Sequence, residues 1–286
     1  MVTITANAKI NLTLDILGKR SDGFHEVEMV MQEISLADII RLERQEQGIR
    51  LAINTPGLSA DRTNLAWQAA ELFLRECKLN SGVNIRIEKS IPIAAGLAGG
   101  SADAAGTLRG LNELFDTGLS EAELCKLGEK LGSDVPFCIC GGTMLASGRG
   151  EKLKRLPSMP DCFVILAKPK VSVSTAWAYL TYDEQGADTH PDNKAFTEAL
   201  CKKDLYGTVS FMGNVLEGVA CRKFKEIDEY KNLMIQNGAM AAMMSGSGPT
   251  VFALTDRKEI AERIVAALQQ SVDAETIRAV KIVNRN

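Results

Sequence analysis

Ser-Ile-Pro-Ile-Ala-Ala-Gly-Leu-Ala-Gly-Gly-Ser-Ala-Asp-Ala-Ala-Gly, residues 90–106, is the stretch of sequence that decides the fold. Gly96, Gly99 and Gly100 lie close together in it, and many of their neighbours are alanines. Such small residues leave the backbone N–H groups of a loop uncovered, and they let it approach other groups closely. We therefore expect this loop to bring its backbone against a ligand.

The loop lies between a predicted strand and a predicted helix. Apolar and polar residues alternate over residues 83–88, and apolar residues recur at helical spacing from Ser101 or Ala102 to Phe115. This order aims several N–H groups and the positive end of a helix dipole at one point, where a phosphate group binds well. The alternative is a turn that only lets a helix pack closely on a sheet. Neither Gly-Lys-Ser/Thr nor Gly-x-Gly-x-x-Gly occurs in the loop, which excludes the two commonest motifs for phosphate.

Length and composition are those of a globular protein with one large domain or two modest ones. The chain has 286 residues and a formal net charge of −3, which argues against general attraction to nucleic acid or to an anionic membrane. Its apolar runs are all shorter than the ~20 residues that span a bilayer. The first residues alternate like a strand rather than forming a signal peptide, so we expect a cytoplasmic protein.

Cysteine and histidine usage predicts neither a zinc site nor a disulfide framework. The seven cysteines are an odd number, they are scattered, and Cys-x-x-Cys is absent. Only two histidines occur in the chain. Cys138-Ile139-Cys140 is predicted to be a buried strand.

The first sixteen residues alternate between apolar and polar with few exceptions. A strand of this pattern places Lys9 and Asn11 on one face, about 7 Å apart along the chain. The two side chains can then act on one ligand. The alternative is a strand face exposed to solvent.

Two further turns carry residues that have either a structural or a binding role. Residues 18–25 form a turn that ends with Phe24 and His25, which supply a flat ring for stacking and a directional hydrogen-bonding group. The alternative is a packed aromatic beside a surface histidine. Asp134 follows a predicted helix that begins with a capping box at Ser120 and stops at Gly132. This aspartate either shapes the turn before Pro136 or performs chemistry.

The other elements are predicted from periodicity and turn residues. We expect a domain boundary near residue 155 within a loose stretch, a central strand at 162–167, and a polar turn leading into a helix at 171–179. An exposed loop follows, in which His190 is solvated and has no role. The remaining predictions are a helix at 64–77, two or three amphipathic helices in 193–238, a strand-turn-strand at 239–252, a helix at 258–270 and a strand at 277–283.

The glycine-rich loop resembles the phosphate-binding motif of the GHMP small-molecule kinases, in the run Pro92-x-x-x-Gly96-Leu97-Ala98-Gly99-Gly100-Ser101-Ala102. Ala98 stands where that motif has a glycine, so we expect no positive φ there. Three other segments match the family in the same order. They are Ala-Lys-Ile-Asn-Leu at 8–12, Gly-Ser-Asp-Val-Pro-Phe at 132–137 and Ser-Gly-Ser-Gly-Pro-Thr at 245–250.

The resemblance covers essentially the whole chain and implies an α+β, two-domain GHMP kinase fold. It implies a ribosomal protein S5 domain 2-like N-terminal domain at 1–155 that binds ATP, a ferredoxin-like C-terminal domain at 156–286, and an active site between them. ATP and Mg²⁺ are the implied cofactors. The residues implied to bind ATP are Pro92, Ile93, Ala94, Ala95, Gly96, Leu97, Ala98, Gly99, Gly100, Ser101 and Ala102.

Catalytic and substrate-binding roles follow from the same resemblance. Lys9 and Asp134 are implied to be catalytic, and Asp134 is the implied acceptor of the proton from the substrate hydroxyl. The residues implied to bind the substrate are Asn11, Phe24, His25, Thr175 and Tyr179. No protein ligand of the metal is predicted beyond a suggestion of Ser101.

The turn Arg20-x-Asp22-Gly23-Phe24-His25 is typical of the branch of the family whose substrate is a cytidine diphosphate-linked methylerythritol. The resemblance therefore implies an ATP-dependent kinase of the non-mevalonate isoprenoid route. Homoserine or mevalonate kinase activity is one alternative, and a non-catalytic nucleotide-sensing protein is another. We expect a small-molecule substrate and no nucleic-acid or membrane partner; either a monomer or a homodimer is compatible with the sequence.

Overall fold

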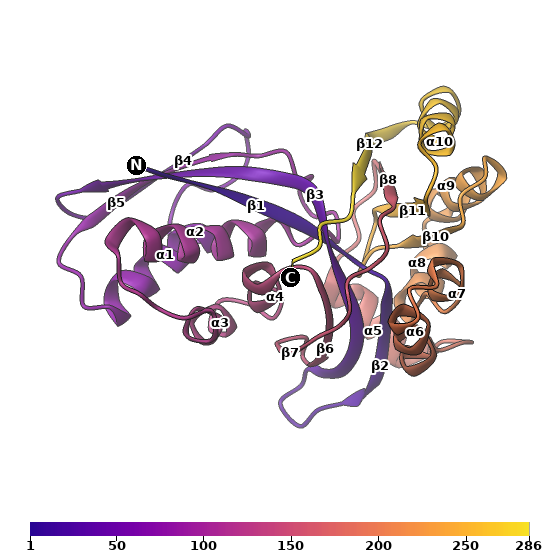
Figure 1. Ribbon diagram of the computed structural model, residues 1–286, viewed down its shortest axis with the longest axis horizontal. Coiled ribbons are helices and arrows are strands. Elements are labelled where there is room, and N and C mark those ends of the chain that lie inside the picture. The colour runs from indigo at the N-terminus through magenta and orange to yellow at the C-terminus, as the bar shows by residue number, and fades with distance from the viewer. Residues whose placement is uncertain (286) are drawn as a thin grey trace. The chain divides into compact units, whose positions relative to one another are not determined.

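The computed structural model describes residues 1–285 and divides into two compact units (Figure 1). Unit 1 comprises residues 1–8, 36–91 and 98–141, and unit 2 comprises residues 9–35, 92–97 and the chain from 142 onward. Strands β1 (Val2–Asn11) and β3 (His25–Gln45) contribute residues to both units. The units are therefore interleaved in sequence, and the domain boundary near residue 155 stays a prediction.

Unit 1 places helices against a sheet. Strand β5 (Gly82–Glu88) pairs antiparallel with the end of β3 and parallel with β4 (Ile49–Ile53). Figure 1 shows α1 (Leu65–Glu76) and α2 (Gly99–Phe115) side by side along these strands. Glycines allow this close approach, because a Cβ atom at Gly106 would lie 2.6 Å from Ile40 Cδ1 and one at Gly110 would lie 2.4 Å from Leu42 Cδ1.

Two short helices complete unit 1. Helix α3 (Glu121–Glu129) has the predicted capping box between Ser120 and Glu123. Residues 138–140 lie in α4 (Val135–Cys140), so the predicted strand is wrong, although its residues are buried as expected. Pro136 stands near the start of α4, where its fixed φ suits a helix and its missing N–H costs no hydrogen bond.

The first part of β3, in unit 2, continues the same eight-stranded sheet. It pairs antiparallel with β2 (Thr13–Lys19) and β6 (Thr143–Gly148), while β7 (Lys152–Arg155) pairs with β6 and β9 (Gly213–Asn214) pairs with β2. The alternating segment at the N-terminus is broken into β1 and β2 at Leu12 rather than forming one strand. The predicted loose stretch after residue 151 is also wrong in part, because β7 pairs with β6 there.

A second sheet, in unit 2, has the order β10-β11-β8-β12, and its neighbouring strands are antiparallel. The predicted central strand at 162–167 is confirmed, since β8 (Phe163–Pro169) lies between β11 (Val251–Thr255) and β12 (Ala274–Lys281). The edge strand is β10 (Ala241–Met244). Helices α9 (Lys225–Gln236) and α10 (Lys258–Ser271) pack on this sheet and on each other (Figure 1).

Four further helices belong to unit 2: α5 (Thr175–Gln185), α6 (Asn193–Cys201), α7 (Leu205–Ser210) and α8 (Val215–Lys223). Residues 193–238 thus contain four helices, α6 to α9, rather than two or three. The chain as a whole mixes helices and sheets, which confirms the predicted α+β class. Within residues 1–285, no helix has both the length and the apolar character needed to cross a membrane.

Candidate active site

Lys9 and Asn11, near the end of β1, form the centre of a buried polar cluster in unit 2. The two residues are only 4% and 1% exposed. The alternative of a strand face exposed to solvent is therefore wrong. Lys9 Nζ donates to Asn11 Oδ1 at 2.7 Å and to the carbonyl oxygen of Gly96 at 3.3 Å. A buried ammonium group needs such acceptors. The cluster therefore holds a positive charge in a defined position.

The first half of the glycine-rich loop packs on the turn at residues 245–248. Ser245 Oγ donates to the carbonyl oxygen of Gly96 at 3.0 Å, and Lys9 N donates to the carbonyl oxygen of Leu97 at 3.2 Å. Gly96 has φ +73°, and a Cβ atom there would lie 2.2 Å from the carbonyl oxygen of Ser245. Only glycine fits this position.

Gly246 brings the same turn against the β1 side chains. Its φ is +58°, and a Cβ atom there would lie 3.2 Å from Asn11 Oδ1 and 3.4 Å from Lys9 Nζ. Parts of three predicted motifs therefore meet within unit 2: residues 9–12 of the motif at 8–12, residues 92–97 of the motif at 92–102, and the turn at 245–250. Sequence spacing alone does not bring them together.

Asn214 supports this turn, and the sequence analysis missed it. Its Nδ2 donates to the carbonyl oxygens of Met244 at 2.9 Å and Gly246 at 2.8 Å, while its Oδ1 accepts from Leu216 N at the start of α8. The only local signal is that asparagine is a good N-cap. Its bonds to a turn thirty residues away have no signature in the sequence.

The second half of the loop leads directly into α2 in unit 1. The helix begins at Gly99, two residues earlier than the first of the predicted starts, and its N-cap is Ala98. Ala98 has φ +58°, so the expectation that alanine would avoid a positive φ is wrong. Ala98 has no side chain with which to cap the helix, so no side chain of the N-cap residue covers the N–H groups of the first turn, which are groups that can bind an anion.

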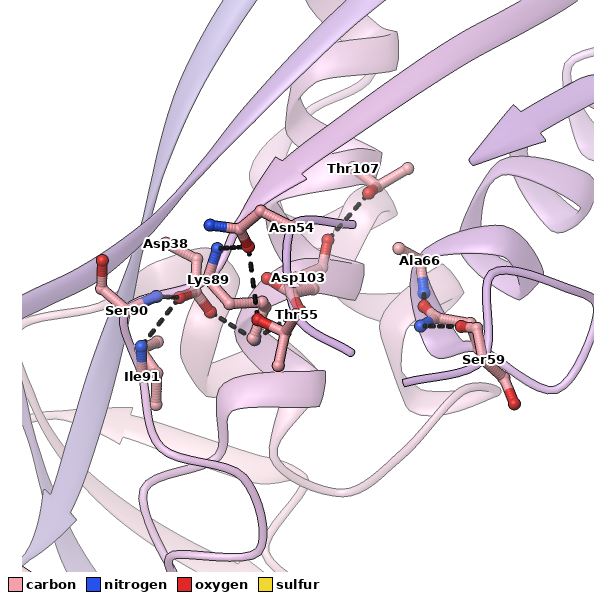
Figure 2. A network of polar contacts seen from close by, with 11 residues as sticks. Asp38, Asn54, Thr55, Ser59, Ala66, Lys89, Ser90, Ile91, Asp103 and Thr107 are labelled. Carbon is pink, nitrogen blue, oxygen red and sulfur yellow. Dashed lines mark hydrogen bonds and ion pairs between the residues drawn. The ribbon is translucent and has the colours of Figure 1, made fainter. Parts of the chain in front are cut away.

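A buried network of charges fixes the strand end, the loop entry and α2 within unit 1 (Figure 2). Lys89 Nζ donates to Asp38 and to Asp103 Oδ2, the latter at 2.7 Å. Asp38 Oδ1 accepts from the backbone N–H groups of Ser90 at 2.6 Å and Ile91 at 2.9 Å. Because Asp103 lies in α2, the network ties the first turns of that helix to the residues that enter the loop.

Asp103 has an unusual environment in this network. It is 5% exposed, and its Oδ1 is buried without a hydrogen-bond partner among residues 1–285. Burial raises the pKa of its carboxyl to about 7, against the opposing attraction of the Lys89 ammonium. The sequence analysis missed all three charged residues, because they come from separate elements.

Asp134 is the N-cap residue of α4 and is half-buried. Its side chain makes no capping hydrogen bond, so capping of α4 does not explain its presence. Lys9 belongs to unit 2 and Asp134 to unit 1. The joint action of these two groups stays a prediction.

His25, another of the predicted substrate-binding residues in unit 2, contacts one face of α5. The rings of His25 and Tyr179 have centroids 4.9 Å apart and planes tilted by 36°. His25 Nε2 lies 2.7 Å from Asp183 Oδ1, and the histidine side chain is only 10% exposed. The alternative of a surface histidine is therefore wrong, and Asp183 is a partner that the sequence analysis missed.

Phe24 contacts a different side chain from those around His25. It is 53% exposed, and the Arg149 guanidinium carbon lies 5.0 Å from its ring centroid. A large exposed aromatic with a cation over its face can stack on a planar ligand. Arg149 was not predicted from the sequence.

Thr175, the first residue of α5, connects with the turn at 245–248. Its Oγ1 lies 2.8 Å from Ser247 Oγ. The predicted substrate helix and the third predicted motif are therefore in contact. His190, for which no role was predicted, is exposed as expected, and its Nδ1 lies 2.6 Å from Asp15 Oδ1.

Among residues 1–285, no group of three or more His, Cys, Asp or Glu side chains is placed to hold a metal ion. Ser101, in the first turn of α2, has a hydroxyl that forms no hydrogen bond with another residue in this range. A hydroxyl at this point is compatible with a Mg²⁺ ion bound mainly by phosphates.

Two family models match the chain. Residues 64–142 match the GHMP kinases N terminal domain, and residues 196–274 match the GHMP kinases C terminal domain. The first match contains the whole glycine-rich loop and Asp134. The second contains Asn214 and the turn at 245–248.

Curated relatives are similar along most of their length. A protein from Acetivibrio thermocellus is 45% identical over 258 residues, which cover 90% of this chain and 91% of the relative. One from Listeria monocytogenes serotype 4a is 48% identical over 269 residues, which cover 94% and 92%. Both carry the name 4-diphosphocytidyl-2-C-methyl-D-erythritol kinase.

Solved structures give the same likeness. A crystal structure of 4-(cytidine 5'-diphospho)-2C-methyl-D-erythritol kinase has a TM-score of 0.83 at 33% identity, covering 99% of this chain and 100% of the other. A homoserine kinase from Cytophaga hutchinsonii has a TM-score of 0.73 at 20% identity, covering 99% and 94%. The second likeness shows the fold alone.

Proposed function

The chain belongs to the GHMP kinase family, and from this premise we propose that it phosphorylates the 2-hydroxyl of 4-diphosphocytidyl-2-C-methyl-D-erythritol. ATP is the phosphoryl donor, and the products are the 2-phosphate and ADP. The reaction belongs to non-mevalonate isoprenoid biosynthesis. Similarity to relatives of that name over at least 90% of the chain supports the choice of substrate.

The observation that carries the proposal is the buried contact of Lys9 with Asn11 and with the Gly96 carbonyl. It joins a cationic side chain to the backbone of the loop that resembles a phosphate-binding motif. Phosphoryl transfer depends on positioning and on neutralising charge far more than on covalent participation of the protein. A fixed ammonium beside a phosphate loop meets that need.

The loop and the first turn of α2 hold the phosphates of ATP in this proposal. Gly99 and Gly100 lack side chains that would cover the N–H groups, and the helix dipole favours the negative charge. Mg²⁺ bound with ATP supplies further neutralisation of the phosphate charge. Ser101 is the side chain that would contact it.

Lys9, Asn11 and Asp134 act on the acceptor hydroxyl. Asp134 orients the hydroxyl and accepts its proton, as a general base does. Lys9 stabilises the negative charge that develops during transfer and, when close to Asp134, favours the ionised carboxylate. Asn11 holds the Lys9 ammonium in place through the 2.7 Å bond.

The cytidylyl end of the substrate lies against Phe24, His25 and Tyr179. The aromatic faces stack on the cytosine ring, and the imidazole provides a hydrogen bond to its edge. Thr175 contacts the region between the base and the acceptor hydroxyl. These roles distinguish the proposed substrate from homoserine and mevalonate, which carry no base.

The test is ATP consumption with purified protein and Mg²⁺. ADP release should depend on the diphosphocytidyl substrate, and mass spectrometry with ³¹P NMR should locate the new phosphate on the 2-oxygen. Homoserine and mevalonate are the controls for other kinases of this fold. Release of ADP with homoserine or mevalonate alone would show that this compound, and not the diphosphocytidyl compound, is the substrate. Binding of nucleotide without turnover would favour a nucleotide-sensing protein over an enzyme.

A further inference from the structure

Two side chains of helix α5 contact the imidazole of His25. Tyr179 and Asp183 are four residues apart on α5 and therefore lie on the same face of that helix. Tyr179 contacts the imidazole ring at a centroid distance of 4.9 Å, and Asp183 Oδ1 lies 2.7 Å from its Nε2. The position of the ring and the partner of one ring nitrogen are thus fixed together.

Asp183 is held as an acceptor at this position. Its second oxygen, Oδ2, accepts from Lys19 Nζ at 2.7 Å. Hydrogen bonds from Lys19 and from His25 lower the pKa of the Asp183 carboxyl. An ionised carboxylate only accepts hydrogen bonds, so the hydrogen between it and the imidazole belongs to His25 Nε2.

The other ring nitrogen is then an acceptor. A neutral imidazole has one N–H and one nitrogen with a lone pair, and a hydrogen on Nε2 leaves Nδ1 with the lone pair. Nδ1 of His25 forms no hydrogen bond with another residue among 1–285. Cytosine carries an amino donor at its 4-position, whereas uracil has an acceptor oxygen there. An acceptor at Nδ1 suits cytosine and opposes uracil.

We propose that Asp183 is a positioning residue that fixes the His25 tautomer with Nδ1 as acceptor and thereby selects cytosine over uracil. This inference rests on the proposed function, because it concerns the base of the same substrate. Asp183 itself does not touch the substrate. It acts through His25, and it gives specificity rather than catalysis.

The first test reads the tautomer directly, without activity. The chain has only two histidines, so ¹⁵N–¹H correlation spectra at pH 8.5 contain two imidazoles, and His25→Gln assigns them. The wild type should show His25 with hydrogen on Nε2. Asp183→Ala should give a mixture of tautomers. The same tautomer in both proteins would overturn the inference.

The second test measures the selectivity for cytosine over uracil. We expect the ratio of kcat/KM for the cytidylyl substrate over its uridylyl analogue to fall about tenfold in Asp183→Ala, the usual effect of losing one hydrogen bond. The KM for ATP should stay unchanged. Glu184→Gln, a neighbouring exposed carboxylate on α5, is the matched control and should keep the wild-type ratio.

Asp183→Asn keeps the shape of the side chain and guards against misfolding of the alanine variant. Its amide either accepts from Nε2 or donates to it, and the spectrum shows which. Selectivity should follow the observed tautomer across all variants; selectivity that does not follow it overturns the inference. A wild type that consumes no ATP with either substrate refutes the proposed function instead, and the spectra still test the tautomer.

Discussion

Ser245 Oγ donates a 3.0 Å hydrogen bond to the carbonyl oxygen of Gly96, although 149 residues separate them in the sequence. The backbone of Ser245 also leaves no room for a side chain at position 96. Its carbonyl oxygen would lie 2.2 Å from a Cβ atom at position 96. Because the obstructing atom belongs to the backbone, it cannot rotate away as the end of a side chain can.

Gly96→Ala should therefore both destabilise the protein and remove activity. The positive φ of +73° costs about 1–2 kcal/mol for a residue with a Cβ atom, and the overlap adds about 1–3 kcal/mol. Relief of the overlap must move the loop and the turn at 245–248 apart, which disturbs the position of the Gly96 carbonyl that Lys9 contacts. Urea unfolding measures the first effect, and kcat measures the second.

Gly118→Ala is the matched control for this prediction. Gly118 has φ +67°, but nothing lies within 4 Å of a Cβ atom placed there. This variant should lose only the stability that corresponds to the cost of a positive φ, and its kcat should be unchanged. Equal losses of stability in the two variants would show that the contact with Ser245 has no energetic consequence.

Asp134→Asn tests the proposed general base. We expect kcat to fall by roughly 10²–10⁴, the usual range for removal of such a base. Stability should change little, because asparagine has the same size and shape as aspartate. Steady-state kinetics and thermal unfolding are measured on the same preparation, with exposed Glu129→Gln as the control. Near-full turnover in the asparagine variant would remove Asp134 from the mechanism.

Local patterns predicted much of the fold. The capping box at Ser120, the alternating strand before the loop and the central strand at 162–167 depend on neighbours in the sequence, and all three are confirmed. The prediction of a strand at residues 138–140 was wrong because a short apolar run fits a buried strand or a buried helix equally well. Ala98 takes up a positive φ although this costs an alanine about 1–2 kcal/mol, so the preference of a single residue did not predict the shape of the loop.

The candidate site was predictable only as separate motifs. Resemblance identified Lys9, Gly96 and the turn at 245–250, and the structure brings them together in unit 2. The supporting residues, such as Asn214 and Asp183, bond to partners far away in the chain. A lone polar residue within a helix or at its end has no pattern that reveals such a partner.

Phe24→Ala tests the base-binding end of the site. Removal of an exposed ring that stacks on cytosine should raise the KM for the cytidylyl substrate about tenfold and leave the KM for ATP unchanged. Phe211→Ala, another partly exposed phenylalanine in unit 2, is the control. An equal rise in both KM values would mean that Phe24 supports the structure rather than the base.

Lys89→Met tests the buried network in Figure 2. The change leaves the carboxyl groups of Asp38 and Asp103 buried together without the ammonium that both contact. Loss of one partner of a buried ion pair costs about 3–5 kcal/mol. Lys130→Met removes the exposed pair with Glu76 and should cost less than about 1 kcal/mol. Similar urea midpoints for the two variants would contradict a structural role for the network.

Asp103 should make stability depend on pH near neutrality. Its folded pKa of about 7 is higher than the value of ~3.9 expected in the unfolded chain. Between these values the folded state holds a proton that the unfolded state releases, so stability falls as pH rises. The slope is at most about 1.4 kcal/mol per pH unit, and it disappears below pH ~4 and well above pH 7, where both states carry the same charge.

Asp103→Asn removes this titration and should flatten the dependence. Urea unfolding at intervals between pH 5 and 8 gives the free energy of unfolding for wild type and variant, and their difference isolates the contribution of Asp103. Asp161→Asn, at an exposed position, should retain the wild-type slope. The difference between wild type and Asp103→Asn should change most between pH 5 and 7, because there the buried carboxyl stays protonated only in the folded state. Parallel curves would mean that Asp103 is already ionised in the folded protein and that Lys89 offsets its burial.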